Sequence, residues 1–164
     1  LGLDFIDSIG IDKITRRVEE LTNLFITEMS KLTHNNGVPI VRLFGPLETV
    51  NRGGTVMLNF QDENENSIDY GWVEEKANER LISIRTGCFC NPGIDETNNC
   101  VSNEEMLQYY TSREENKFSS NTNYLKYMSE QIGRMRGAIR ASFGIATTTK
   151  DIETFIDFAS SFKK

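Results

Sequence analysis

Hydrophobic residues recur every three or four positions over residues 3–33, with charged residues between them. This spacing predicts an amphipathic helix, bent near Gly10, in which Asp12 caps the longer second part. Similar spacing returns later in the chain. The expected helices cover residues 3–33, 68–80, 103–110 and 123–133, and a last helix begins after a cap at residues 147–151.

For two of these helices the sequence also predicts the buried side chains or the cap. The helix over residues 68–80 is expected to pack inward through Trp72, Val73 and Ala77. The helix over 103–110 starts with Ser102 as its cap and Glu105 three positions later, which is the pattern of a capping box.

Shorter apolar runs rich in β-branched and aromatic residues lie between the helices. The expected strands are residues 38–44, 55–60, 81–85 and 138–143. No glycine fingerprint for binding phosphate follows any of them. We therefore expect an α+β fold: a small, mostly antiparallel sheet of three or four strands, with helices packed on one face.

Composition narrows the possible functions. The chain has 164 residues, a length suited to one domain, and a net charge of −6 that disfavours nucleic acid or an anionic membrane as the partner. No apolar run reaches the roughly 18 residues of a membrane helix, and no signal peptide is evident, so we expect a cytoplasmic protein. Because the sequence begins at Leu1 within a helical pattern, we expect a piece of a longer protein.

Three cysteines, Cys88, Cys90 and Cys100, lie in or after the stretch Ile82-Ser83-Ile84-Arg85-Thr86-Gly87-Cys88-Phe89-Cys90-Asn91-Pro92-Gly93. An odd number of cysteines makes a poor disulfide framework. Arg85 could lower the pKa of a neighbouring thiol and activate it, but two small apolar residues in a turn would look the same. Cys100 could add a third thiolate for zinc, but no fourth ligand is evident, because the only histidine, His34, lies far away in the sequence. We expect His34 to face solvent or to stand at the C-terminal end of a helix.

The stretch Gly137-Ala138-Ile139-Arg140-Ala141-Ser142-Phe143-Gly144 places one cation inside an apolar strand. A cation in such a strand needs a partner, because burying an unpaired charge is unfavourable. Arg140 could hold a ligand carboxylate with both guanidinium arms, or it could form a structural salt bridge.

Taken together, these two stretches and the capped C-terminal helix resemble the class V aminotransferase superfamily. The nine residues from Arg85 to Gly93 are similar to a stretch found in the cysteine-desulfurase-like part of molybdenum cofactor sulfurases. The resemblance implies that residues 1–164 are the small C-terminal domain of a fold-type-I pyridoxal-phosphate enzyme. Pyridoxal phosphate would be held by a lysine of the absent large domain, so none is expected to bind covalently here.

The resemblance also implies roles for single residues. Cys90 would be the nucleophile that takes sulfur from an L-cysteine-like substrate as a persulfide, and Arg140 and Arg85 would line the site for the substrate carboxylate. Cys88 could be an auxiliary thiol or filler. The parent enzyme would be a homodimer that passes sulfur to an acceptor protein or cofactor. Two alternatives stay open: a class V aminotransferase or epimerase without sulfur chemistry, and a non-enzymatic module that binds a metal or a partner.

Overall fold

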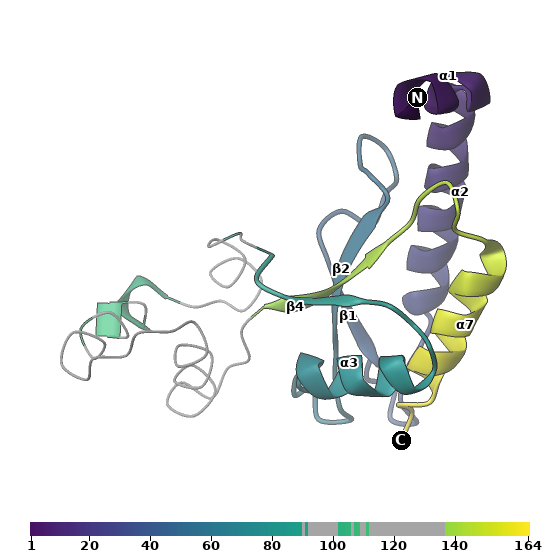
Figure 1. Ribbon diagram of the computed structural model, residues 1–164. Helices are drawn as coiled ribbons and strands as arrows, with labels where there is room; N and C mark the ends of the chain where they lie inside the picture. The colour runs from purple at the N-terminus through teal and green to yellow at the C-terminus, as the bar shows by residue number, and fades with distance from the viewer. Residues whose placement is uncertain (90, 92–101, 106, 109–110, 112–136) are drawn as a thin grey trace. The chain divides into compact units, whose positions relative to one another are not determined.

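The computed structural model describes residues 1–89, 91, 102–105, 107–108, 111 and 137–164 (Figure 1). The chain divides into two compact units. The first unit comprises Leu1–Arg85 and Ile139–Lys164, and the second comprises Thr86–Ala138. The predicted helix over residues 123–133 and the residues Cys90 and Cys100 lie outside the described residues.

The described chain contains both helices and strands, in mixed order. In order they are α1 (Gly2–Ile9), α2 (Ile11–Met29), β1 (Val41–Phe44), β2 (Thr55–Phe60), α3 (Tyr70–Glu79), β3 (Arg85–Gly87), β4 (Ala138–Ser142) and α7 (Thr149–Ser160). The strands form one four-stranded sheet in the order β1-β2-β4-β3, in which β2 runs antiparallel to both β1 and β4. The predicted α+β fold with a small, mostly antiparallel sheet is confirmed.

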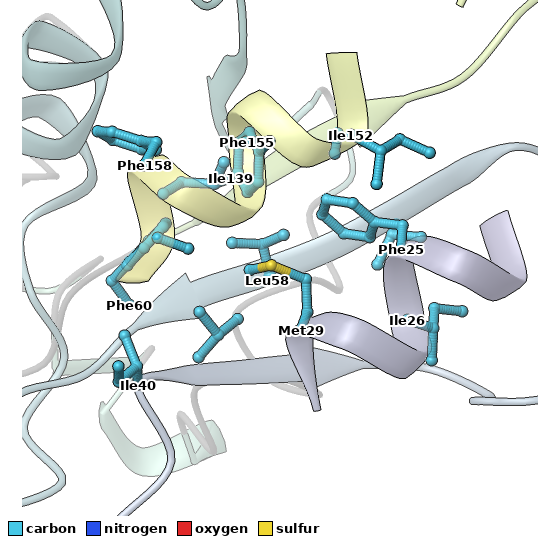
Figure 2. Packing of buried hydrophobic residues seen from close by; sticks show 14 of the residues in the cluster. Phe25, Ile26, Met29, Ile40, Leu58, Phe60, Ile139, Ile152, Phe155 and Phe158 are labelled. Atoms are coloured by element: carbon cyan, nitrogen blue, oxygen red, sulfur yellow. The ribbon is translucent and has the colours of Figure 1, made fainter. Parts of the chain in front are cut away.

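The core lies where α2 and α7 pack against one face of this sheet. In Figure 2, Phe25 and Met29 of α2 and Phe155 of α7 surround Leu58 on β2. Leu58 is opposite Leu43 on β1 and Ile139 on β4, so the alternating positions of three strands present one apolar surface. Figure 1 shows α7 beside the C-terminal half of α2, which closes this core.

The long N-terminal helix is divided at the predicted glycine. Gly10 adopts a φ of +93°, ends α1 and stands at the N-cap of α2. Because no side chain caps α2, the predicted capping role of Asp12 is wrong, and this residue lies in the first helical turn instead. The helix also ends earlier than predicted, at Met29, and His34 to Val38 form a hydrogen-bonded turn.

The predicted strand over residues 81–85 is wrong at its start. Leu81 is 95% exposed with a φ of +58°, and the amide of Ile82 donates to the carbonyl of Ala77 at 2.9 Å. This is a Schellman ending of α3, in which a leucine occupies the left-handed position usually taken by glycine. The helix end therefore continues to Ile82, and β3 begins only at Arg85.

Helix α3 differs from prediction at one side chain. Val73 and Ala77 are buried as predicted, but Trp72 is 46% exposed, so the prediction that it faces inward is wrong. Its ring contacts Phe162 only edge-on, with the ring centres 5.7 Å apart.

The predicted caps before α7 and at Ser102 are both present, each as a capping box. The Thr148 hydroxyl accepts from the Asp151 amide while the Asp151 carboxylate accepts from the Thr148 amide, and Ser102 and Glu105 exchange the same two bonds. In the described part of the chain, no helix is long and apolar enough to cross a membrane.

Candidate functional site

The predicted nucleophile loop begins at the end of β3. Cys88 is a free, half-buried cysteine, and its carbonyl accepts a hydrogen bond from the Asn91 amide at 2.9 Å. Phe89, between them, adopts a φ of +53°, so the chain turns sharply directly after Cys88. The predicted nucleophile Cys90 lies outside the described residues, and its role stays a prediction.

Two glycines hold the backbone of the second unit close together at this loop. Gly87 has a φ of +105° and Gly137 a φ of +78°. A methyl group on Gly137 would lie 2.7 Å from both the carbonyl carbon and the carbonyl oxygen of Gly87. Side chains do not fit at such distances, so the geometry of this contact depends on glycine at position 137. The sequence shows both glycines but not that they meet.

Arg140 lies in the middle of β4, between Ile139 and Ala141, which are both in the core. Because side chains alternate along a strand, Arg140 projects from the opposite face of the sheet from the helices. It is half-buried and pairs across the ladder with Met57 of β2. An arginine at this position can reach a ligand bound on the face of the sheet that lies away from the helices.

Arg85 is exposed at the start of β3, and β3 neighbours β4 in the sheet. The two arginines predicted to line a carboxylate site are thus on adjacent strands of the same unit. An arginine in either position offers paired N–H donors, which match the two oxygens of a carboxylate.

Sequence reasoning missed Arg42, which lies on the same face of the sheet as Arg140. Arg42 of β1 is exposed, and its guanidinium carbon lies 5.2 Å from the ring centre of Phe44. Phe44 is opposite Met57, which is itself opposite Arg140, so Arg42 and Arg140 share the face away from the helices. The signal in the sequence is the alternation of Val41, Arg42 and Leu43, which places the arginine on the opposite face from its apolar neighbours. The burial of Val41 agrees with this alternation.

The lysines of the described residues do not fit a cofactor held covalently in an enclosed site. None of them is buried: Lys76 is half-buried beside Glu79, and the others are exposed. Within the same residues, no three histidine, cysteine or acidic side chains gather as a metal site would require.

His34, expected to face solvent or to stand at the C-terminal end of a helix, is only 2% exposed and lies beyond the end of α2 at Met29, so the expectation is wrong. Its Nε2 lies 3.0 Å from the Gln61 carbonyl oxygen, and its Nδ1 accepts from the Lys164 amide at 3.2 Å. These partners require the neutral tautomer that carries its proton on Nε2. His34 is a structural residue that joins three segments.

Comparison with known proteins confirms the resemblance seen in the sequence. No family model matches the chain. The chain is 27% identical over 162 residues to the human molybdenum cofactor sulfurase, covering 96% of this chain and 17% of that protein. It is 29% identical to the molybdenum cofactor sulfurase of Drosophila mojavensis and 26% identical to that of rice, covering 90% and 98% of this chain and 18% and 19% of those proteins.

A solved structure shows a similar fold. The apo cysteine desulfurase of Thermococcus onnurineus NA1 superposes with a TM-score of 0.59 and 17% sequence identity, over 98% of this chain and 28% of that one. The chain thus spans less than a fifth of the length of the sulfurases it matches and under a third of the desulfurase. It is homologous to one part of the molybdenum cofactor sulfurases and has the fold of one part of a cysteine desulfurase.

Proposed function

We propose that this chain is the small C-terminal domain of a pyridoxal-phosphate-dependent cysteine desulfurase-like enzyme. Its role is to take sulfur from an L-cysteine-class substrate as a persulfide on Cys90. The observation that carries the proposal is the similarity of 96–98% of this chain to one part of the molybdenum cofactor sulfurases. The stretch from Arg85 to Gly93 and the strand arginine Arg140 support it.

Each proposed residue has a defined task. Arg140 and Arg85 hold the substrate carboxylate through charge-assisted hydrogen bonds, which fixes the position of the substrate sulfur. The Cys90 thiolate then attacks that sulfur. A sulfur–sulfur bond forms, the carbon–sulfur bond breaks, and its electron pair stays on the carbon, which takes up a proton to give alanine.

The cofactor is proposed to be held by a domain outside this chain. Pyridoxal phosphate, bound through a lysine of another domain, supplies the electron withdrawal that such a cleavage needs. In this proposal the chain contributes substrate binding and the nucleophile, and no lysine among the described residues is buried. The parent protein is proposed to be a homodimer and to pass its sulfur to an acceptor protein or cofactor.

The test is an assay of the parent enzyme with pyridoxal phosphate and L-cysteine, in which alanine and sulfide are both measured. Cys90→Ser should abolish sulfide release, whereas Cys88→Ser, in the same loop, should retain most of it. Removing the Arg140 donors by Arg140→Met should reduce kcat/KM by about 10- to 100-fold, from the loss of hydrogen bonds to a charged group.

Other results would assign another function. Sulfide release that survives Cys90→Ser would contradict the proposed nucleophile. Transamination without sulfide would indicate the aminotransferase alternative. Stoichiometric zinc in the purified chain would indicate the binding-module alternative.

A further inference from the structure

A groove of about 660 Å³ lies between α3 and the C-terminal end of α7, within the first compact unit. Its floor is apolar and its rim is mostly basic. The floor is formed by Ile68, Trp72, Phe158 and Phe162. The charged rim residues are Lys76, Arg80, Lys163 and Lys164, against Asp62 and Glu79. None of these residues has a part in the proposed sulfur chemistry.

Trp72 is the feature that marks this groove as a contact surface. It is the only tryptophan of the chain, and 46% of it is exposed. Its ring is nonetheless supported, because it meets Phe162 edge-on at an angle of 86°. A large aromatic ring held in place in the unbound protein loses little conformational freedom on binding, which is why tryptophan is enriched at the centres of interfaces.

Arg80 extends the same surface. Its guanidinium carbon lies 5.6 Å from the ring centre of Phe158, and the residue is exposed. An arginine stacked on an aromatic ring keeps its outward N–H donors available for an oxygen ligand. The groove thus combines an aromatic anchor site with an adjacent oriented cation.

The charge of the rim is opposite to that of the protein. The chain carries a net charge of −6, but four cations and two anions border the groove. Lys76 pairs with Glu79 at 2.7 Å, and Lys164 lies 3.4 Å from Glu63. Arg80 and Lys163 take part in no ion pair among the residues that the structure describes. A ligand that brings carboxylates would complement these two positions.

We propose that the groove is a docking site for an acidic polypeptide segment of a partner protein, which inserts one apolar or aromatic side chain against Trp72. The apolar floor accepts that side chain, and Arg80 and Lys163 bind acidic residues beside it. Nucleic acid is the alternative occupant that the test distinguishes, because its evenly spaced phosphates cannot avoid Asp62 and Glu79, whereas a peptide can place its acidic residues beside Arg80 and Lys163 alone. This proposal does not depend on the proposed desulfurase activity.

The experiment uses an array of decapeptides that vary independently in net charge and in the presence of one leucine or phenylalanine. The 164-residue chain is applied to the array. Each peptide that binds is then titrated into a solution of the chain, and binding is followed by the fluorescence emission of Trp72. Acidic peptides with an apolar residue should bind and shift the emission to shorter wavelength. Binding should weaken as salt is raised, because the rim contacts are exposed.

Two variants test the location of the site. Trp72→Ala removes the fluorophore, so its binding is followed by the fluorescence anisotropy of a dye-labelled peptide, with the unchanged chain measured in the same way. It should weaken binding by about 30-fold, the size expected for an interface hot spot. Arg80→Glu combined with Lys163→Glu should weaken it at least about tenfold and leaves the aromatic floor intact. The matched control is Lys13→Glu with Arg16→Glu, which makes the same charge change at exposed positions of α2 outside the groove and should leave binding unchanged.

The outcomes that overturn the proposal are specific. The first is an array that selects neutral or basic peptides, or none. The second is a control variant, Lys13→Glu with Arg16→Glu, that weakens binding as much as Arg80→Glu with Lys163→Glu does. The third is binding of an oligothymidine but of no peptide. The proposal would also be overturned if the variant with Arg80→Glu and Lys163→Glu bound acidic peptides as tightly as the unchanged chain.

Discussion

The close approach of Gly87 and Gly137 predicts a large effect from one added methyl group. Gly137→Ala places a Cβ atom 2.7 Å from backbone atoms of Gly87, and backbone atoms cannot move aside as the end of a side chain can. Two costs add. A positive φ costs alanine about 1–2 kcal/mol, and forcing the two segments apart costs about 1–3 kcal/mol. The free energy of unfolding should therefore fall by about 2–5 kcal/mol.

Two other glycines separate these two costs. Gly10 has a φ of +93°, but a Cβ atom added there would have no neighbour within 4 Å. Gly10→Ala should therefore lower the free energy of unfolding only through the strain of a positive φ, by about 1–2 kcal/mol. Gly53 has neither a positive φ nor a close neighbour, so Gly53→Ala should change stability by no more than about 0.5 kcal/mol.

Urea unfolding followed by circular dichroism measures all three variants on one scale, and an unchanged slope would show that the unfolded state is comparable. The expected order of destabilisation is Gly137→Ala, then Gly10→Ala, then Gly53→Ala. The close approach would be refuted if Gly137→Ala were no more destabilising than Gly10→Ala.

Three further predictions address other parts of the fold. His34→Phe keeps the ring but leaves the Gln61 carbonyl and the Lys164 amide without their partner, so urea unfolding should show a loss of about 2–4 kcal/mol, and a loss under about 0.5 kcal/mol would contradict the bonding described. Leu81→Gly should raise the free energy of unfolding by about 1 kcal/mol, because glycine adopts the left-handed helix end without strain, and a decrease would be evidence against that conformation. Hydrogen bonds from the Thr148 amide and hydroxyl hold the pKa of Asp151 below its ordinary value of 3.8, so its stabilising effect is present above that pH and is lost as the pH falls through the lowered pKa. Melting temperatures at pH 7 and pH 3 should therefore show Asp151→Asn less stable than the unchanged chain at pH 7 and a smaller difference at pH 3, and a difference that does not shrink would contradict this assignment.

The sequence predicted the elements whose signals are local. The cap at Thr148 and Asp151 satisfies backbone groups only three positions apart, so its residues indicate it directly. Strand β2 was predicted with its bounds, because Thr55–Phe60 alternates apolar side chains that meet one core. The break at Gly10 likewise needs only the backbone freedom of that residue. The stretches from Arg85 to Gly93 and from Gly137 to Gly144, together with the capped C-terminal helix, were also enough to indicate the homologous proteins.

Two of the residues that sequence reasoning misplaced, His34 and Trp72, depend on partners far along the chain. His34 is buried because Lys164, at the other end of the sequence, donates to it. Trp72 stays half-exposed because Phe162 supports its edge without covering it. Burial is set by what other segments bring to a residue, and periodicity within one helix does not contain that information.

The candidate site also has features that the sequence indicates and features that only the structure shows. The residue types and spacing of the loop and of Arg140 left thiol chemistry and carboxylate binding open, and it was the resemblance to the class V aminotransferase superfamily that implied them. Only the tertiary structure decided that Arg140 faces away from the helical layer, that Arg42 shares its face, and that Gly87 and Gly137 meet. Side-chain chemistry is a property of each residue, whereas the sheet register that joins β1, β2 and β4 is a property of strands distant in sequence, and it exists only once they pair.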